Sequence, residues 1–228
     1  MKSIRYIFTA ILLLGAGYIS AQDCGTVGLI LPPSYPDYPN GKPWSMTVCI
    51  TPATVHTPKG NPVPVYQMSN EWTSSEKNDM KSVCLNYYGD RITFEAEATT
   101  KYNCHAYAWD GGTTYWMNPP NQAAYWNDGS YVKISTTPPA GAKVRYTASD
   151  HSAILTSMAG EFSSKWGPGP QFRHSIDDSP FLVTNPTTDL EYYVIPIPPI
   201  PISISGPAKV CVNSSASFSV NNAPTGYT

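Results

Sequence analysis

The chain has few charged residues and no concentration of positive charge. Asp, Glu, Lys and Arg make up 13% of its 228 residues, and 14 basic against 16 acidic side chains leave a net charge of −2. No lysine or arginine cluster is present, so the sequence indicates neither a nucleic-acid partner nor binding to an anionic membrane. Low charge with abundant Pro, Tyr, Thr and Ser is typical of an extracellular, loop-rich protein with many strands.

Metal-binding motifs are also lacking. The cysteines and histidines show neither Cys-x-x-Cys nor His-x-x-x-His spacing, the arrangements that would place ligands around one ion. The sequence therefore predicts no metal site and no cofactor.

The N-terminus has the pattern of a secretory signal peptide. Lys2 and Arg5 precede an apolar run from residue 7 to residue 19, and small residues follow at positions 20 and 21. The run is too short for a comfortable bilayer span. We therefore expect residues 1–21 to be removed, leaving a secreted or cell-surface protein with no membrane span.

An odd number of cysteines remains after that cleavage, namely Cys24, Cys49, Cys84, Cys104 and Cys211. In an oxidising compartment one thiol is then expected to stay free or to await a partner. Cys24–Cys49 is the favoured disulfide, because both residues lie in the N-terminal segment. Cys211 belongs to a separate module. We therefore expect Cys84 to be free or paired elsewhere.

The hydrophobic periodicity predicts an α+β domain over residues 22–197 with a β-rich N-terminal extension. A strand is expected at residues 44–51 and a helix from Ser74, with Met80, Val83, Cys84 and Tyr87 on one side. A long loop rich in aromatic residues is expected at residues 110–130. Further strands are expected at residues 131–134, 142–148, 151–157, 161–166 and 191–195.

The C-terminal part differs in composition. Residues 198–202 are predicted to be a stiff, Pro-rich linker, because proline cannot donate to a β-ladder. Beyond it, residues 204–211 and 216–220 resemble the first strands of the Ig-like or PKD-like repeats of secreted multidomain bacterial proteins. We expect residues 203–228 to be the truncated start of such a β-sandwich.

Cys104 and His151 have the local settings of a cysteine nucleophile and its general base. Asn103 is a good N-cap, so Cys104 takes the first position of a short helix, where free N–H groups and the helix dipole favour a thiolate. His105 points about 100° away from Cys104 on a helix, so a distant imidazole is better placed. His151 opens an expected core strand and meets that need. A structural cysteine and a satisfied strand histidine are the alternative interpretation.

A helix opened by cysteine, a Pro-Ala-Gly turn at residues 139–141, a strand and the strand His-Ser-Ala-Ile-Leu follow one another in this order. The order resembles the NlpC-type and CHAP-type cysteine amidases and peptidases, a papain-like superfamily, over residues 100–166. The resemblance implies a papain-like (NlpC-like) core with the nucleophile helix packed on an antiparallel sheet. It also implies Cys104 as nucleophile, His151 as base and a third polar residue on the next strand.

Two positions depart from that pattern. Ala142 stands where these families usually have Asp, and counting through the hairpin puts Ser164 at the third catalytic position. Serine orients an imidazole less well than His, Asn or Asp. His174 is the alternative third member, and a surface-loop histidine is the other interpretation of that residue.

Oxyanion stabilisation is assigned to the backbone N–H of Cys104, helped by Asn103 or Tyr102, with Trp166 in the cleft wall. The aromatic residues Trp116, Tyr125, Trp126 and Trp166 either line a groove or pack the long loop onto the core.

These observations predict a secreted cysteine hydrolase, of the thiol-protease class, that cleaves amide bonds in peptidoglycan or in peptides. The alternative is a non-catalytic adhesion or carbohydrate-binding module on the same fold.

Overall fold

The computed structural model describes residues 23–28, 44–181, 183–196, 203–205, 215, 217 and 219–221. The chain divides into two units, Met1–Val194 and Ile195–Thr228. Antiparallel sheets with few helices confirm the predicted α+β class. The expected signal peptide and the Pro-rich linker lie outside the described residues.

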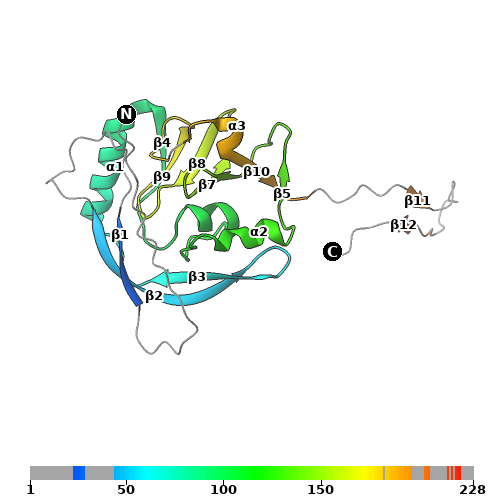
Figure 1. Cartoon of the computed structure of the whole chain (residues 1–228), viewed down its shortest axis with the longest axis horizontal. Helices are drawn as coiled ribbons and strands as arrows, with labels where there is room; N and C mark the ends of the chain where they lie inside the picture. Colours follow the sequence, from blue (N-terminus) through cyan, green and yellow to red (C-terminus); the bar gives the residue numbers. More distant parts are fainter. Residues whose placement is uncertain are drawn as a thin grey trace. The chain divides into compact units, whose positions relative to one another are not determined.

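A seven-stranded antiparallel sheet is the centre of the first unit, with the strand order β4-β9-β8-β7-β6-β10-β5 (Figure 1). The strands are β4 (Ile92–Ala96), β5 (Val132–Ile134), β6 (Lys143–Tyr146), β7 (His151–Leu155), β8 (Glu161–Lys165), β9 (Gln171–Ser175) and β10 (Leu190–Val194). The strands predicted between residues 131 and 195 are all present. The sequence pattern did not indicate β4 and β9, which pair with each other at one edge of the sheet.

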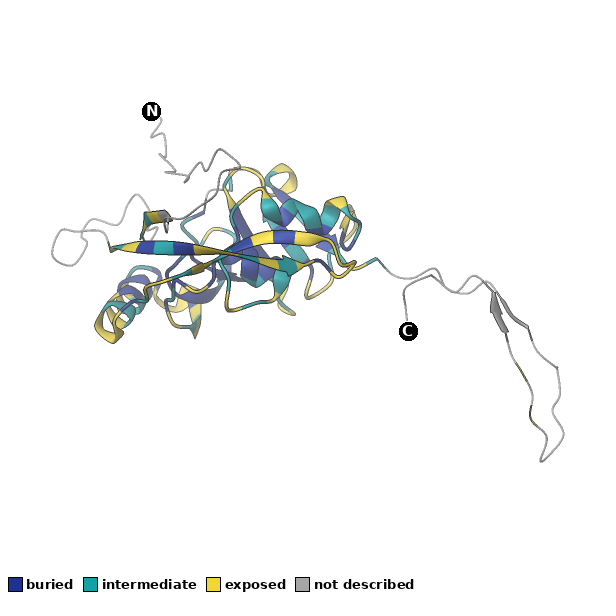
Figure 2. Ribbon diagram, turned by 90° about the horizontal axis from the view of Figure 1, so that it is seen from below, coloured by how far each residue is buried: buried dark blue, intermediate teal, exposed yellow. Residues whose placement is uncertain are grey.

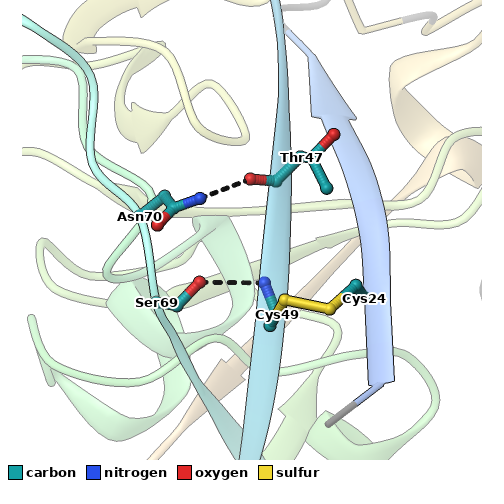
Figure 3. Close-up of a disulfide and its surroundings, with 5 residues drawn as sticks. All are labelled: Cys24, Thr47, Cys49, Ser69 and Asn70. Atoms are coloured by element: carbon teal, nitrogen blue, oxygen red, sulfur yellow. Dashed lines mark hydrogen bonds between the residues drawn. A yellow bond between two sulfur atoms is a disulfide. The ribbon is translucent and has the colours of Figure 1, made fainter.

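A second antiparallel sheet consists of β1 (Asp23–Gly28), β2 (Ser45–His56) and β3 (Pro62–Met68). Exposed residues alternate with partly or fully buried ones along much of β2 (Figure 2). Cys24 and Cys49 lie directly opposite each other on β1 and β2 and form a disulfide, as predicted (Figure 3). Ser69 and Asn70, which follow β3, bind the β2 backbone at Cys49 N (2.9 Å) and Thr47 O (2.7 Å).

The two faces of the seven-stranded sheet bear different hydrophobic layers. Helix α1 (Ser74–Tyr88) covers one face, where Met80, Val83 and Cys84 pack in one cluster with Ala153 and Leu155 of β7. The π-helix η3 (Ala106–Asp110) contacts β6, β7 and β8, and its Trp109 belongs to a second cluster that includes Ile154. The short helices η4 (Asn121–Ala123) and α2 (Ala124–Asn127) follow, and η4 contacts β3. Successive residues of β7 therefore pack in the hydrophobic layers on opposite faces of the sheet.

Helix α1 confirms the predicted helix, although Tyr88 rather than Tyr87 is the fully buried tyrosine. Its start is a capping box. The Thr73 side chain accepts a bond from Glu76 N (3.3 Å), and the Glu76 carboxylate accepts one from Thr73 N (2.8 Å). The 3-10 turn η2 (Gly89–Arg91) ends the helix and leads directly into β4.

Replacing Thr73 with alanine is expected to lower the free energy of unfolding by about 1 kcal/mol, because one orphan N–H of the first turn loses its acceptor. Urea unfolding monitored by circular dichroism measures this change. Ser75→Ala, an exposed serine in the same turn, is the matched control and should change stability far less. Equal losses in the two variants would contradict a capping role for Thr73.

The remaining elements are few. Helix α3 (Pro186–Asp189), capped by the Asn185 side chain, precedes β10. In the second unit, β11 (Ser203–Ser205) pairs antiparallel with β12 (Ser219–Asn221), and the assignment to an Ig-like or PKD-like repeat stays a prediction. Within the described residues, no helix combines the length and the apolar character needed to cross a membrane.

Candidate active site

Cys104 opens a helical turn, as predicted. Cys104 and His105 are helical and lead directly into η3. The Asn103 side chain accepts a bond from Ala106 N (3.1 Å), which is the N-cap bond, and it donates to Met117 O (2.7 Å). The Cys104 thiol is free and buried, so it is not a disulfide cysteine.

His105, the residue after Cys104, makes two polar contacts through its ring. Its ring is 2% exposed, with Nδ1 2.9 Å from Ser152 Oγ and Nε2 3.3 Å from Asp150 Oδ1. Burial by itself lowers the pKa of this imidazole, but the neighbouring Cys104 thiolate and the Asp150 carboxylate outweigh it and raise the pKa to about 10. The arrangement therefore holds a positive charge next to the thiol. In the sequence, the residues that point to this role of His105 are Asp150 and Ser152, the polar neighbours of the predicted base His151.

His151 begins β7, as predicted, and is 1% exposed. Its ring stacks on Phe181 at 3.4 Å and meets the edge of Tyr146 at 4.8 Å. Ser152, the next residue, binds His105 and Trp109 on the opposite face of the strand. His151 therefore shares its face with Ala153 and Leu155, which pack in the cluster under α1.

Neither ring nitrogen of His151 has a hydrogen-bond partner among the described residues. Burial, and next the charges of His174 and His105, hold its pKa well below the usual range, so the ring is neutral at physiological pH. The structure thus shows no hydrogen bond between His151 and Cys104, and their catalytic pairing stays a prediction.

The two candidates for the third position bind each other. Ser164 Oγ on β8 lies 2.7 Å from His174 Nε2 on β9, and His174 Nδ1 lies 2.6 Å from Ser175 O. His174 is 1% exposed on a core strand, so the surface-loop interpretation is wrong. Burial lowers its pKa to about 4. Neither residue hydrogen-bonds to His151, although all three lie on the same sheet face.

Trp166 is fully buried against Tyr88 and Phe172, which places it in the core rather than on an open cleft wall. The Tyr102 hydroxyl lies 3.4 Å from Gln171 Oε1. Tyr125 is 1% exposed and packs near Trp109. These contacts favour the interpretation in which the aromatic residues pack the long loop onto the core.

Lys165 is a buried cation that the sequence reasoning did not single out. It is 0% exposed, and its Nζ donates to Thr99 O (3.2 Å), Gly167 O (2.8 Å) and Gly169 O. Burial lowers its pKa to about 7, against the opposing effect of the Cys104 thiolate and Glu71. The signal in the sequence was a lysine that follows the apolar and small residues at positions 162–164 of this strand.

A pocket of about 300 Å³ lies at the turn between β6 and β7, where residues 145–151 meet Pro119, Pro120 and Gln122. It includes His151 and Asp150, and Asp150 connects it through His105 to the segment that carries Cys104. No cluster of three or more His, Cys, Asp or Glu side chains suited to a metal ion occurs in the described part of the chain.

Comparisons with protein-family models, with curated proteins and with solved structures found no match to this chain. The chemistry of the site is therefore inferred from its own geometry.

Proposed function

We propose that the chain is a secreted thiol hydrolase that cleaves amide bonds in peptidoglycan stem peptides or in other peptides, on a papain-like core of the NlpC or CHAP kind. One observation carries the proposal. A reduced, buried cysteine stands at the first position of an N-capped helix, beside an imidazole that Asp150 and Ser152 fix in place. A nucleophile, an imidazole beside it and a carboxylate bound to that imidazole are the groups that a thiol hydrolase needs.

The two neighbouring histidines take different roles in this proposal. Both nitrogens of His105 are already engaged, so its ring acts as a fixed cation that stabilises the Cys104 thiolate. Within the part of the chain that the structure describes, both nitrogens of His151 lack hydrogen-bond partners, and its ring is neutral, which is the form that accepts a proton. We assign His151 the transfer of the thiol proton to the leaving amine, while sulfur forms the thioester and the C–N bond breaks.

The reactivity of Cys104 towards iodoacetamide tests the proposal without any knowledge of the substrate. We expect the folded protein to be alkylated at Cys104 below pH 8, because the His105 cation and the capped helix start beside the thiol favour its reactive form. Cys84 is the internal control. It is also free and buried, but burial in the apolar core raises the pKa of its thiol to about 12, so it should react only after unfolding. Mass spectrometry of the two cysteine-containing peptides across a pH series measures both.

His105→Gln should slow the alkylation of Cys104 below pH 8, because the variant lacks the cation that lies beside the thiol. His56→Gln, an exposed histidine, should leave the profile unchanged. A Cys104 that resists iodoacetamide as firmly as Cys84 would overturn the proposal. The non-catalytic binding module, which the missing His151–Cys104 bond favours, would then be the better description.

A further inference from the structure

Lys165, at the end of β8, is a buried cation without a bound carboxylate among the described residues. Its side chain is 0% exposed, and none of the ion pairs that the described residues form includes it. Its Nζ instead lies over the Tyr102 ring, 5.2 Å from the ring centre. Lysine is rarely fully buried, and a buried charge without an opposite charge is costly. The proposed function gives this charge no role so far.

Backbone carbonyl groups surround the Lys165 side chain and fit its charged form. Nζ donates to Thr99 O (3.2 Å), Gly167 O (2.8 Å) and Gly169 O. Three acceptors take three N–H bonds, which an ammonium group has and a neutral amine lacks. The structure therefore holds an ammonium group at this point.

These contacts join two segments of the chain at the start of the cysteine helix. Lys165 binds the loop that follows β8 to the segment 99–102, and Thr99 N also donates to that loop at Pro168 O (3.0 Å). The segment leads through the N-cap residue directly to Cys104. The position of the nucleophile in the chain thus depends on the contacts of the ammonium group.

The charges that act on Lys165 include the nucleophile itself. Burial lowers the pKa of Lys165 to about 7, and the Cys104 thiolate is the strongest opposing charge, ahead of Glu71. Glu71 already has other partners, namely Trp72 N at 2.8 Å and Lys77 at 3.7 Å. Coupling between two sites is reciprocal, so an ammonium group that the thiolate stabilises also stabilises the thiolate.

We propose that Lys165 is a positioning residue for the Cys104 nucleophile. Its ammonium group fixes the segment 99–102 that leads into Cys104, and it supplies a buried positive charge, in addition to that of His105, that favours the thiolate. This role rests on the proposed function, since the thiolate is that of the hydrolase.

Titration of Lys165 with and without the thiol tests the coupling in the full chain. In protein with ¹³C-labelled lysine, Lys165 should titrate near pH 7, far below ordinary lysines. Cys104→Ala should lower this pKa by at least about half a unit, as expected for two unit charges within about 20 Å at an effective dielectric constant of about 20. Cys84→Ala, which removes the other free and buried thiol, should leave it unchanged. A lysine with a merely structural role would respond to neither variant.

Lys165→Met tests the effect on the thiol. The variant keeps an unbranched side chain and removes the charge, so iodoacetamide should alkylate Cys104 at least about threefold more slowly at pH 7, which is the same coupling expressed as a rate. Lys143→Met is the matched control, because Lys143 also lies over a tyrosine ring, that of Tyr131 at 5.9 Å, and it should leave the rate unchanged. Circular dichroism checks that both variants fold. If Lys165→Met does not fold, the titration of Lys165 decides.

A Lys165 pKa that is the same in Cys104→Ala as in the intact chain would overturn the role of Lys165, and so would an unchanged alkylation rate in folded Lys165→Met. The proposed function fails by a different result, namely a Cys104 in the intact chain that resists iodoacetamide as firmly as Cys84. A Lys165 that responds to Cys104→Ala in a chain without hydrolase activity would support the pair of charges and refute only the turnover.

Discussion

Replacing Cys104 with alanine is expected to abolish amide hydrolysis, with a loss of at least about 10³-fold in kcat, because no other group can form the thioester. The measurement is the release of free amines from purified peptidoglycan and from N-acyl dipeptide anilides. The substitution should leave the circular dichroism spectrum unchanged, since the helix start depends on the Asn103 cap rather than on the thiol.

Cys84→Ala is the matched control for that experiment. It removes a free, buried cysteine from the cluster under α1, so it should cost about 1 kcal/mol of stability and leave turnover intact. Full activity in Cys104→Ala would refute the cysteine mechanism, and equal loss in the two variants would show that only folding was affected.

The two histidine variants separate proton transfer from charge stabilisation. His151→Gln should reduce kcat and leave the alkylation profile of Cys104 in place. His105→Gln should slow the alkylation of Cys104, because it removes the cation that Asp150 holds beside the thiol. If instead His105→Gln alone stops turnover and His151→Gln is fully active, then His105 is the base and the predicted pair is wrong.

Acidification is expected to unfold the protein steeply between about pH 6.5 and pH 4, because two buried histidines are neutral in the folded state. Burial lowers the pKa of His174 to about 4 and holds that of His151 well below its usual range, whereas both titrate near 6.5 when unfolded. Their stabilisation is therefore complete above about pH 6.5 and is lost as the pH falls, since the unfolded chain then binds more protons. Near pH 5 each contributes a slope of about 1 kcal/mol per pH unit.

Near pH 5 the other buried basic groups do not offset this slope. The pKa of His105 is raised to about 10 and that of Lys165 is lowered only to about 7, so both are protonated in both states near pH 5. A combined loss of several kcal/mol is a large part of the 5–15 kcal/mol by which domains are typically stable.

Urea unfolding at pH 7, 6 and 5 measures the effect. The double variant Ser164→Ala, His174→Leu removes both partners of the buried hydrogen bond and should roughly halve the slope. His56→Gln, at an exposed site, should keep the wild-type slope. An unchanged slope in the double variant would show that His174 titrates alike in the folded and unfolded states.

Local patterns in the sequence were sufficient to predict several features of the fold. Asn103 before Cys104 predicts a capped helix start, because a side-chain acceptor there satisfies a free N–H within one turn. The strand from His151 and the helix from Ser74 follow from the spacing of apolar residues over a few positions. The Cys24–Cys49 disulfide was also predictable, since only these two cysteines share the N-terminal segment.

Which face of β7 meets the cysteine helix was decided by the tertiary structure alone. Alternation places His151 and Ser152 on opposite faces, but the sequence does not say which face lies over η3, and a shift of one residue exchanges them. In the structure Ser152 meets His105 and Trp109, while His151 stacks on Phe181. Ser164 and His174, alternatives for a single role in the sequence, bind each other because β8 and β9 are neighbours. The pairing of distant strands depends on packing across the whole sheet, and no local pattern encodes it.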